Sequence, residues 1–134
     1  METIFEVDVN EKEIDHLGHV NYLEYINYSE QAIRDWYIKA GISSDELSDN
    51  NMGTVVIKFD ISYLREARLG DSLKIITTPV RIGTKSFVLK QDIYNQDNIH
   101  ITEFNKTFVM FDLLSRKSIP VIDKIARHFN KSEE

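Results

Sequence analysis

The fold is decided by residues 14–40, IDHLGHVNYLEYINYSEQAIRDWYIKA, in which a tight polar turn runs directly into the longest helical pattern of the chain. Asn21 is a good N-cap, the pattern lasts about five turns, and Gly41 follows as a common stop signal. Apolar and small residues recur at helical spacing, which predicts a helix with one buried face. That face consists of Tyr22, Tyr25, Ile26, Ser29, Ala32, Ile33, Trp36 and Ala40.

The polar turn lies at the positive end of this helix, where free backbone N–H groups favour an anion or a developing negative charge. Asp15, Gly18, His19 and Asn21 cluster there. A carboxylate at this place suits a base or a nucleophile, although a lone aspartate before a helix is more often a capping or turn residue. Gly18 lets substrate or backbone approach closely.

His16 and His19 raise the question of a metal site, because they lie three residues apart in the turn. The chain has no cysteine and offers no clear third ligand, so we expect structural or substrate-lining roles and no metal. The lack of cysteine also excludes a disulfide framework and a cysteine nucleophile.

Composition restricts the class of protein further. A length of 134 residues fits a single domain, residues 1–134, and a hydrophobic fraction of 42% excludes a disordered chain. The net charge of −6 argues against a nucleic-acid partner. The first residues alternate apolar with charged side chains and resemble no signal peptide, and no apolar run approaches the roughly 20 residues that span a bilayer. We expect a cytoplasmic protein without membrane contact.

Five segments show strand patterns, over residues 4–9, 54–65, 72–81, 86–94 and 99–112. The last four are joined by short turns and are therefore expected to pair antiparallel. Pro79 cannot donate to a ladder, so its strand should lie at an edge or carry a bulge. In the clearest strand one face is predicted to hold Val55, Ile57, Phe59, Ile61 and Tyr63.

The remaining segments look like loops and a short tail helix. Residues 42–53 are polar and predict an exposed, mobile loop with at most a helical piece near 44–47. Residues 114–119 predict a loop, an amphipathic segment uses Ile122, Ile125, Ala126 and Phe129, and residues 131–134 should fray. One long helix and one sheet predict an α+β fold in which the sheet wraps the helix on its concave side.

Known catalytic glycine motifs are missing from the sequence. Its glycines stand at 18, 41, 53, 70 and 83, which excludes a G-x-S-x-G nucleophile elbow, a P-loop and a dinucleotide fingerprint.

The turn and helix nevertheless match a known signature. Residues 15–21, DHLGHVN, are followed without gaps by Tyr25, Ile26, Tyr28, Glu30 and Ala32. This pattern resembles the D-x-x-G-H-V-N-x-x-x-Y-[LI]-x-Y-x-E-x-A signature of hotdog-fold acyl-CoA thioesterases of the 4-hydroxybenzoyl-CoA thioesterase type. The stretch 64–71 is similar to that family's L-R-P-A…G-D segment, with Glu66 where proline is common, and 118–120 resembles its closing segment.

The resemblance implies a hotdog fold, homodimers that join two sheets edge to edge, often homotetramers, and active sites between protomers. It implies an acyl-CoA substrate and no cofactor. Asp15 matches the catalytic carboxylate, and the backbone N–H of Tyr22 matches the donor that polarises the thioester carbonyl. Family members differ on whether the carboxylate attacks directly or activates water. A thiol has a pKa near ~8.5 and leaves without a strong general acid, so one aspartate suffices.

We expect the substrate to contact Gly18, His19, Asn21, Glu30, Arg65, Lys85 and Ser86. Glu30 borders the buried helix face, and the basic residues near strand ends, which include Arg68 and Arg81, suit the phosphates of CoA. Two alternatives stay open: a thioesterase for acyl-carrier protein, and a non-catalytic hotdog module that binds acyl ligands.

Overall fold

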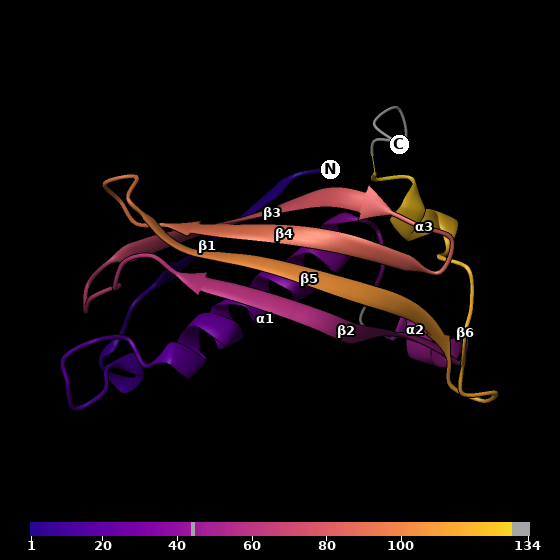
Figure 1. Ribbon diagram of the computed structural model, residues 1–134, viewed down its shortest axis with the longest axis horizontal. Helices are drawn as coiled ribbons and strands as arrows, with labels where there is room; N and C mark the ends of the chain where they lie inside the picture. Colours follow the sequence, from indigo (N-terminus) through magenta and orange to yellow (C-terminus); the bar gives the residue numbers. More distant parts are fainter. Residues whose placement is uncertain (44, 130–134) are drawn as a thin grey trace.

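The structure, a computed structural model, describes residues 1–43 and 45–129. These residues form one curled sheet, one long helix and short helical pieces (Figure 1). In chain order the elements are β1 (Thr3–Asp8), η1 (Glu11–Glu13), α1 (Tyr22–Lys39), α2 (Glu46–Asp49), β2 (Met52–Tyr63), β3 (Ser72–Ile82), β4 (Ser86–Tyr94), β5 (His100–Asp112), β6 (Lys117–Ser118) and α3 (Asp123–Ala126).

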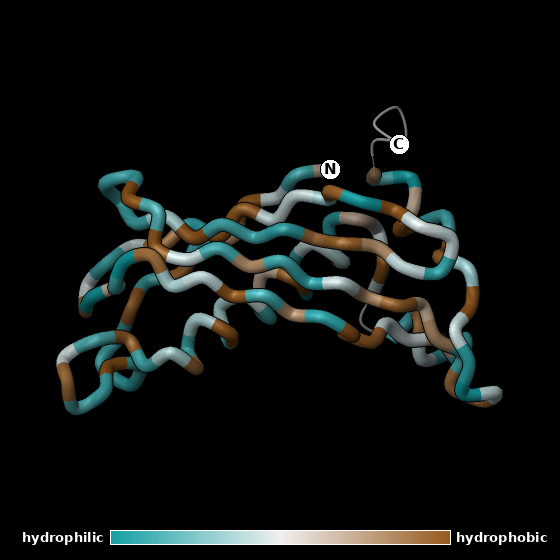
Figure 2. Tube along the Cα trace, viewed as in Figure 1, coloured by the Kyte–Doolittle hydropathy of each residue, from teal (hydrophilic) through white to brown (hydrophobic). Residues whose placement is uncertain are grey.

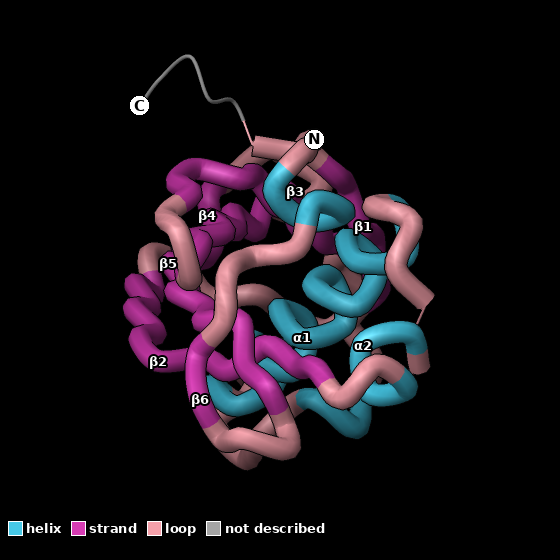
Figure 3. The backbone as a smooth tube through the Cα atoms, turned by 90° about the vertical axis from the view of Figure 1, so that its right-hand side faces the viewer, coloured by secondary structure: helices cyan, strands magenta, loops and turns pink. Residues whose placement is uncertain are grey.

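The sheet has the strand order β1-β3-β4-β5-β2, with every neighbouring pair antiparallel and β6 paired with the end of β5. Short turns connect β3 to β4 and β4 to β5, which is why these three strands are neighbours. Viewed end-on, the strands curve around α1 (Figure 3). The predicted α+β arrangement is confirmed, with β6 as a short strand inside the predicted loop 114–119. The expected pairing of the strand over 54–65 with the strand over 72–81 was wrong, because the connection between them crosses the sheet: β2 pairs with β5, and β3 lies between β1 and β4.

The inner face of the sheet and one side of α1 form the core. Hydrophobic and polar residues alternate along the central strands (Figure 2), and the inward positions of β4 and β5 are buried. The buried residues of α1 are Tyr25, Tyr28, Ser29, Ala32, Ile33 and Trp36.

The predicted helix face was wrong at its first turn. Tyr22 is 61% exposed, because the N-terminal turns of α1 emerge from behind the sheet (Figure 1). Tyr28, which was not assigned to the face, is fully buried and packs in a cluster with Val9 and Val20. The segment before the helix therefore covers the side of α1 that carries Tyr28, which the helical-wheel prediction had left in solvent.

A β-bulge in β2 corrects the predicted face of that strand. Before the bulge, Thr54 and Val56 pair with the inward residues Met110 and Phe108. After the bulge at Ile57, Phe59 pairs with the inward residue Lys106. Directly opposed residues of antiparallel strands share a face, so one extra residue reverses the alternation. Val55 accordingly lies on the outer face, opposite Val109. Phe59, Ile61 and Tyr63, which were predicted to share a face with Val55, lie on the inner face instead.

Pro79 was expected at an edge strand or at a bulge, and the structure has a bulge there. The register of β3 against β4 shifts between Pro79 and Arg81, and the pairing of β3 with β1 ends at Thr77. Proline thus stands where β3 has no neighbour on its β1 side.

The predicted amphipathic tail is confirmed as α3 and the residues after it. Ile125 and Phe129 are buried, and the ring of Phe129 packs edge-on against Trp36 and Phe87. The short helical piece in the polar loop is α2, tied to the tail by an ion pair between Glu46 and Lys124 with an N–O distance of 2.7 Å. Position 44 and the predicted fraying at 131–134 lie outside the described residues.

Candidate active site

The turn before α1 is closed by backbone hydrogen bonds. The N–H of Asp15 donates to the carbonyl of His19 at 2.8 Å, and the N–H of Gly18 donates to the carbonyl of Asp15 at 3.1 Å. Gly18 has φ +82°, a left-handed conformation that residues with a Cβ adopt only with strain. Ile14 and Val20 form an isolated β-bridge at the base of the turn. The turn is thus a fixed mount for its side chains.

The Asp15 carboxylate caps this turn through one oxygen. Oδ1 accepts hydrogen bonds from the N–H groups of Leu17, at 2.9 Å, and His19, at 3.3 Å. Within the described chain, Oδ2 has no hydrogen bond to another residue. The capping role and the chemical role are therefore compatible, because each uses a different oxygen.

In the part of the chain that the structure describes, the first turn of α1 leaves the N–H of Tyr22 free. The side chain of Asn21 accepts the N–H of Leu23 at 2.9 Å, which confirms the predicted cap, and the N–H of Asn21 donates to the carbonyl of Glu13. The N–H of Glu24 donates to the carbonyl of Asn21. Among the described residues the N–H of Tyr22 has no partner, and it stands at the positive end of the helix.

A hollow of about 270 Å³ opens beside the turn. Its wall includes residues from the turn, the helix, the end of β2 and the loop that follows: His19, Val20, Tyr25, Tyr63, Leu64, Arg65 and Glu66. Burial raises the pKa of Tyr25, whose hydroxyl accepts the N–H of Ala67 at 2.9 Å. The hydroxyl of Tyr63 donates to the carbonyl of Tyr22 at 3.3 Å, which ties β2 to the first helical turn.

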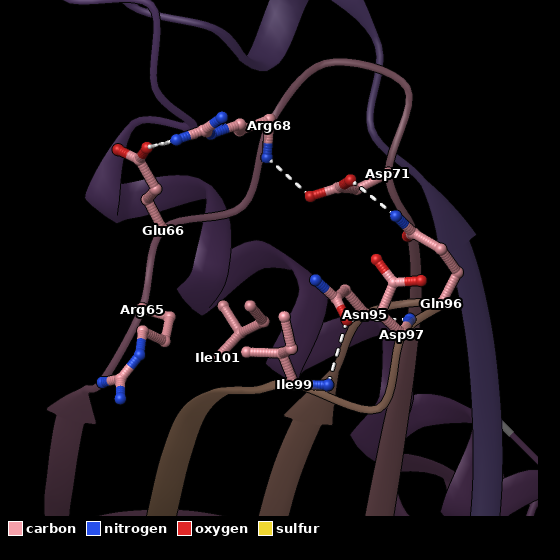
Figure 4. Close-up of a pocket in the computed structure, with 9 residues that line it drawn as sticks. All are labelled: Arg65, Glu66, Arg68, Asp71, Asn95, Gln96, Asp97, Ile99 and Ile101. Atoms are coloured by element: carbon pink, nitrogen blue, oxygen red, sulfur yellow. Dashed lines mark hydrogen bonds and ion pairs between the residues drawn. The ribbon is translucent and has the colours of Figure 1, made fainter.

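A second hollow of about 470 Å³ shares Arg65 and Glu66 with the first (Figure 4). It lies between the loop after β2 and the β4–β5 turn, and polar side chains line most of it. Asp71 connects its two sides, since it accepts the N–H of Arg68 at 2.8 Å and the side-chain amide of Gln96 at 3.1 Å. A polar ligand that reaches the first hollow has room to extend here.

The structure brings together most of the predicted site. Asp15, Gly18, His19, Asn21 and Tyr22 share the turn and first helical turn, and Arg65 shares the first hollow with His19.

Three predicted residues lie elsewhere in the chain. Glu30 lies farther along α1, where its carboxylate accepts a hydrogen bond from Lys106. Lys85 and Ser86 lie at the β3–β4 turn, and that turn and the start of α1 are at opposite ends of the molecule (Figure 1). Within one chain these two do not contribute to the same site as Asp15.

The predicted site lacked five of the residues that line the first hollow: Val20, Tyr25, Tyr63, Leu64 and Glu66. Tyr63 was assigned to a strand face and Glu66 was noted as a departure from the family pattern. Their positions depend on how β2 ends beside the turn, and no local spacing in the sequence carries that information.

Among residues 1–43 and 45–129 no three histidine, aspartate or glutamate side chains converge as metal ligands would. The helices described contain none that is long and apolar enough to cross a membrane.

Comparison with known proteins gives consistent results. The profile of the family described as the thioesterase-like superfamily matches residues 9–129. The long-chain acyl-CoA thioesterase FadM of Escherichia coli K12 is 28% identical over 115 residues, which cover 85% of this chain and 86% of that protein.

Two solved structures show the same fold. Slr0204, a 1,4-dihydroxy-2-naphthoyl-CoA thioesterase from Synechocystis, has a TM-score of 0.90 at 15% identity, over 100% of this chain and 99% of that one. SAV2348 from Staphylococcus aureus, solved in complex with CoA, has a TM-score of 0.89 at 16% identity, over 96% of this chain and 81% of that one.

Proposed function

This chain belongs to the thioesterase-like superfamily and is a thioester hydrolase of the hotdog fold, and from that premise we propose that it hydrolyses acyl-CoA to a free acid and CoA at the turn before α1. In this proposal Asp15 is the base or nucleophile and the N–H of Tyr22 is the oxyanion donor. One observation carries it: among residues 1–43 and 45–129, a carboxylate oxygen and an N–H that bond to no other residue stand at the same helix N-terminus.

The chemistry requires few groups. The thioester carbon is attacked by the Asp15 carboxylate or by a water that Asp15 deprotonates, and the carbonyl oxygen gains negative charge. The N–H of Tyr22 and the helix dipole stabilise that charge, and loss of one such donor typically costs roughly 2.7–4 kcal/mol of barrier. The C–S bond then breaks and the thiolate leaves, because its conjugate thiol is fairly acidic. In the direct route the acyl group is then on Asp15 as a mixed anhydride, which water hydrolyses to the free acid and the Asp15 carboxylate. In the water route the free acid forms as the thiolate leaves.

The acyl-CoA class is supported by the relative FadM, whose name specifies a long-chain acyl-CoA, and by the CoA bound to SAV2348. Arg65 stands between the two hollows and suits an anionic carrier. The carrier is CoA in our proposal, and an acyl-carrier protein is the alternative that the same chemistry admits.

We further propose a homodimer, or a homotetramer built from such dimers, with the site shared between chains. β2 is an edge strand of twelve residues that exposes Val55, Val56 and Ile57, and long apolar edges are covered in stable proteins. Antiparallel pairing of two β2 edges turns the β3–β4 end of one chain toward the α1 N-terminus of the other. Lys85 and Ser86 of the partner subunit then approach the site that they do not reach within one chain.

A thiol-release assay with acetyl-, decanoyl-, palmitoyl- and benzoyl-CoA tests the proposal. We expect release of free CoA from at least one of them. Binding of acyl-CoA without release supports the non-catalytic module instead, and release from acyl-carrier protein alone supports the other carrier.

A further inference from the structure

Glu66 bridges two cations or potential cations beside the proposed site. Its Oε2 contacts Nδ1 of His19, and its Oε1 lies 2.9 Å from Nε and 2.8 Å from Nη2 of Arg68 (Figure 4 shows the Arg68 side). Each carboxylate oxygen therefore has its own partner, and the oxygen that faces His19 is not shared with Arg68.

The loop that carries Glu66 is held on both sides. The next residue, Ala67, is fully buried, and its N–H donates to the hydroxyl of Tyr25. The N–H of Arg68 donates to Asp71, which also binds the β4–β5 turn through Gln96. The Glu66 carboxylate is thus presented to His19 from a fixed backbone.

This contact determines which ring nitrogen of His19 is available to a substrate. A neutral imidazole carries one N–H, and a carboxylate at Nδ1 selects the form in which Nδ1 donates and Nε2 accepts. His19 lines the 270 Å³ hollow, and its backbone N–H donates to Oδ1 of Asp15, so both residues belong to the same turn. With Nδ1 held by Glu66, Nε2 is the acceptor of the His19 ring.

We propose that Glu66 is a positioning residue that orients His19, so that Nε2 of His19 and Oδ2 of Asp15 together hold the attacking water. This inference rests on the proposed hydrolase function and selects its water route. One water proton is held by Nε2 and the other passes to Asp15 as the oxygen bonds to the thioester carbon. The C–S bond breaks, and the proton on Asp15 then goes to the departing thiolate.

If the pair of Glu66 and His19 served only stability, removal of Glu66 would lower the melting temperature. The side chains of His19 and Glu66 are 44% and 35% exposed, and pairs as exposed as this contribute little to stability. Removal of Glu66 should therefore leave the melting temperature almost unchanged, so a loss of rate would not be an effect of lost stability.

The experiment compares Glu66→Leu and Glu66→Gln on the acyl-CoA that the wild type hydrolyses fastest. Leucine removes the acceptor, and we expect kcat to fall roughly tenfold with KM within about twofold, as expected for loss of orientation. Glutamine returns an amide oxygen to Nδ1–H, since Arg68, 73% exposed, is free to turn to water, and should recover most of the rate. In a His19→Phe background Glu66→Leu should have no further effect.

The ring tautomer gives a second reading that needs no substrate. Nitrogen-15 NMR of His19 should report Nδ1–H in the wild type and a shift toward Nε2–H in Glu66→Leu. Glu103→Gln is the matched control, because Glu103 is 34% exposed and pairs with Lys90 on the outer face of the sheet. This control should change neither the tautomer nor kcat.

Three outcomes overturn the inference. They are a Glu66→Leu variant as fast as an active wild type, a tautomer that does not respond, and a glutamine variant as slow as the leucine one, which would assign the effect to the charge of Glu66 itself. A wild type that hydrolyses no acyl-CoA refutes the hydrolase proposal instead, and the tautomer is then still measurable.

Discussion

Nζ of Lys106 donates to Oε1 of Glu30 at 2.5 Å, from a lysine side chain that is only 1% exposed. Lys106 points from β5 toward α1, and its Nζ lies 4.8 Å from the ring centroid of Phe59. Burial lowers the pKa of this lysine, and the hydrogen bond to Glu30 opposes that shift. A charged group thus occupies an inward position of the central sheet, with a partner that is about half exposed.

Removal of the cation should not harm the fold. Lys106→Met keeps the volume and removes a buried charge, so we expect the free energy of unfolding at pH 7 to stay unchanged or rise by up to about 2 kcal/mol. Glu30→Gln leaves the Lys106 ammonium without its carboxylate and should lower the free energy of unfolding by about 1–3 kcal/mol. The loss is smaller than for a fully buried pair, because Glu30 is exposed to water. Urea unfolding of both variants measures these effects, and the opposite order contradicts the account.

The same lysine gives stability a pH dependence with a definite sign. Because its pKa is lower in the folded chain, the unfolded chain binds more protons just below the ordinary lysine pKa of about 10.4. Stability of the wild type relative to Lys106→Met should therefore rise as pH increases toward that value. Other groups with shifted pKa values, such as Tyr37 with its pKa raised to about 12, titrate in both proteins and cancel in the difference. If the difference in unfolding free energy between the wild type and Lys106→Met does not change with pH, the lowered pKa of Lys106 is refuted.

The exposed β2 edge predicts assembly. Ile57 lies at the bulge, has no partner on β5 and is 61% exposed, so Ile57→Glu places a charge at the proposed contact between chains. We expect light scattering to show a dimer or tetramer for the wild type and a shift to monomer for this variant, with loss of activity.

Ile38→Glu is the matched control for that experiment. Ile38 is 65% exposed but belongs to α1 and has no place in the β2 ladder, so the charge should not separate chains paired through β2. A wild type that is monomeric and fully active at micromolar concentration contradicts the shared site.

The oxyanion role of Tyr22 belongs to its backbone, which proline tests directly. Tyr22 is the first helical residue, and Asn21 before it has φ −60° and ψ 138°, a conformation that a following proline requires. Tyr22→Pro should therefore fold, bind acyl-CoA, and lose roughly 10²–10³ in kcat.

Tyr22→Phe and Tyr22→Leu are the controls, since both keep the N–H. We expect each to retain most of the rate, because the side chain is largely exposed. Circular dichroism must show all three folded. An active proline variant, or an inactive phenylalanine variant, places the donor elsewhere.

The sequence predicted the elements of the fold well and their faces less well. Periodicity located α1 and all the long strands, because burial on one side leaves a repeating pattern. It failed at Ile57, where one unpaired residue reverses the faces of β2, and at Tyr22, which has the right spacing but lies beyond the cover of the sheet. Both errors depend on where neighbouring strands begin and end, which is information from the tertiary structure.

The sequence predicted the part of the candidate site that is local in the chain, but not the part that depends on tertiary contacts. Asp15, Gly18, His19 and Asn21 were identified because they are close in sequence and precede a helix. Glu66 reaches His19 only through the loop after β2, so its contact has no local signal. The roles of Lys85 and Ser86 depend on a second chain and stay predictions.

Turnover of Asp15→Asn tests the central claim most directly. The asparagine amide oxygen can still accept the N–H groups of Leu17 and His19, so the turn should keep its shape and the melting temperature should barely change. Asp92→Asn, on the outer face of the sheet in β4, is the control and should keep normal activity. We predict that thiol release by Asp15→Asn falls at least about a hundredfold. A folded Asp15→Asn protein that hydrolyses acyl-CoA at nearly the wild-type rate would contradict the assignment of Asp15 and the mechanism built on it.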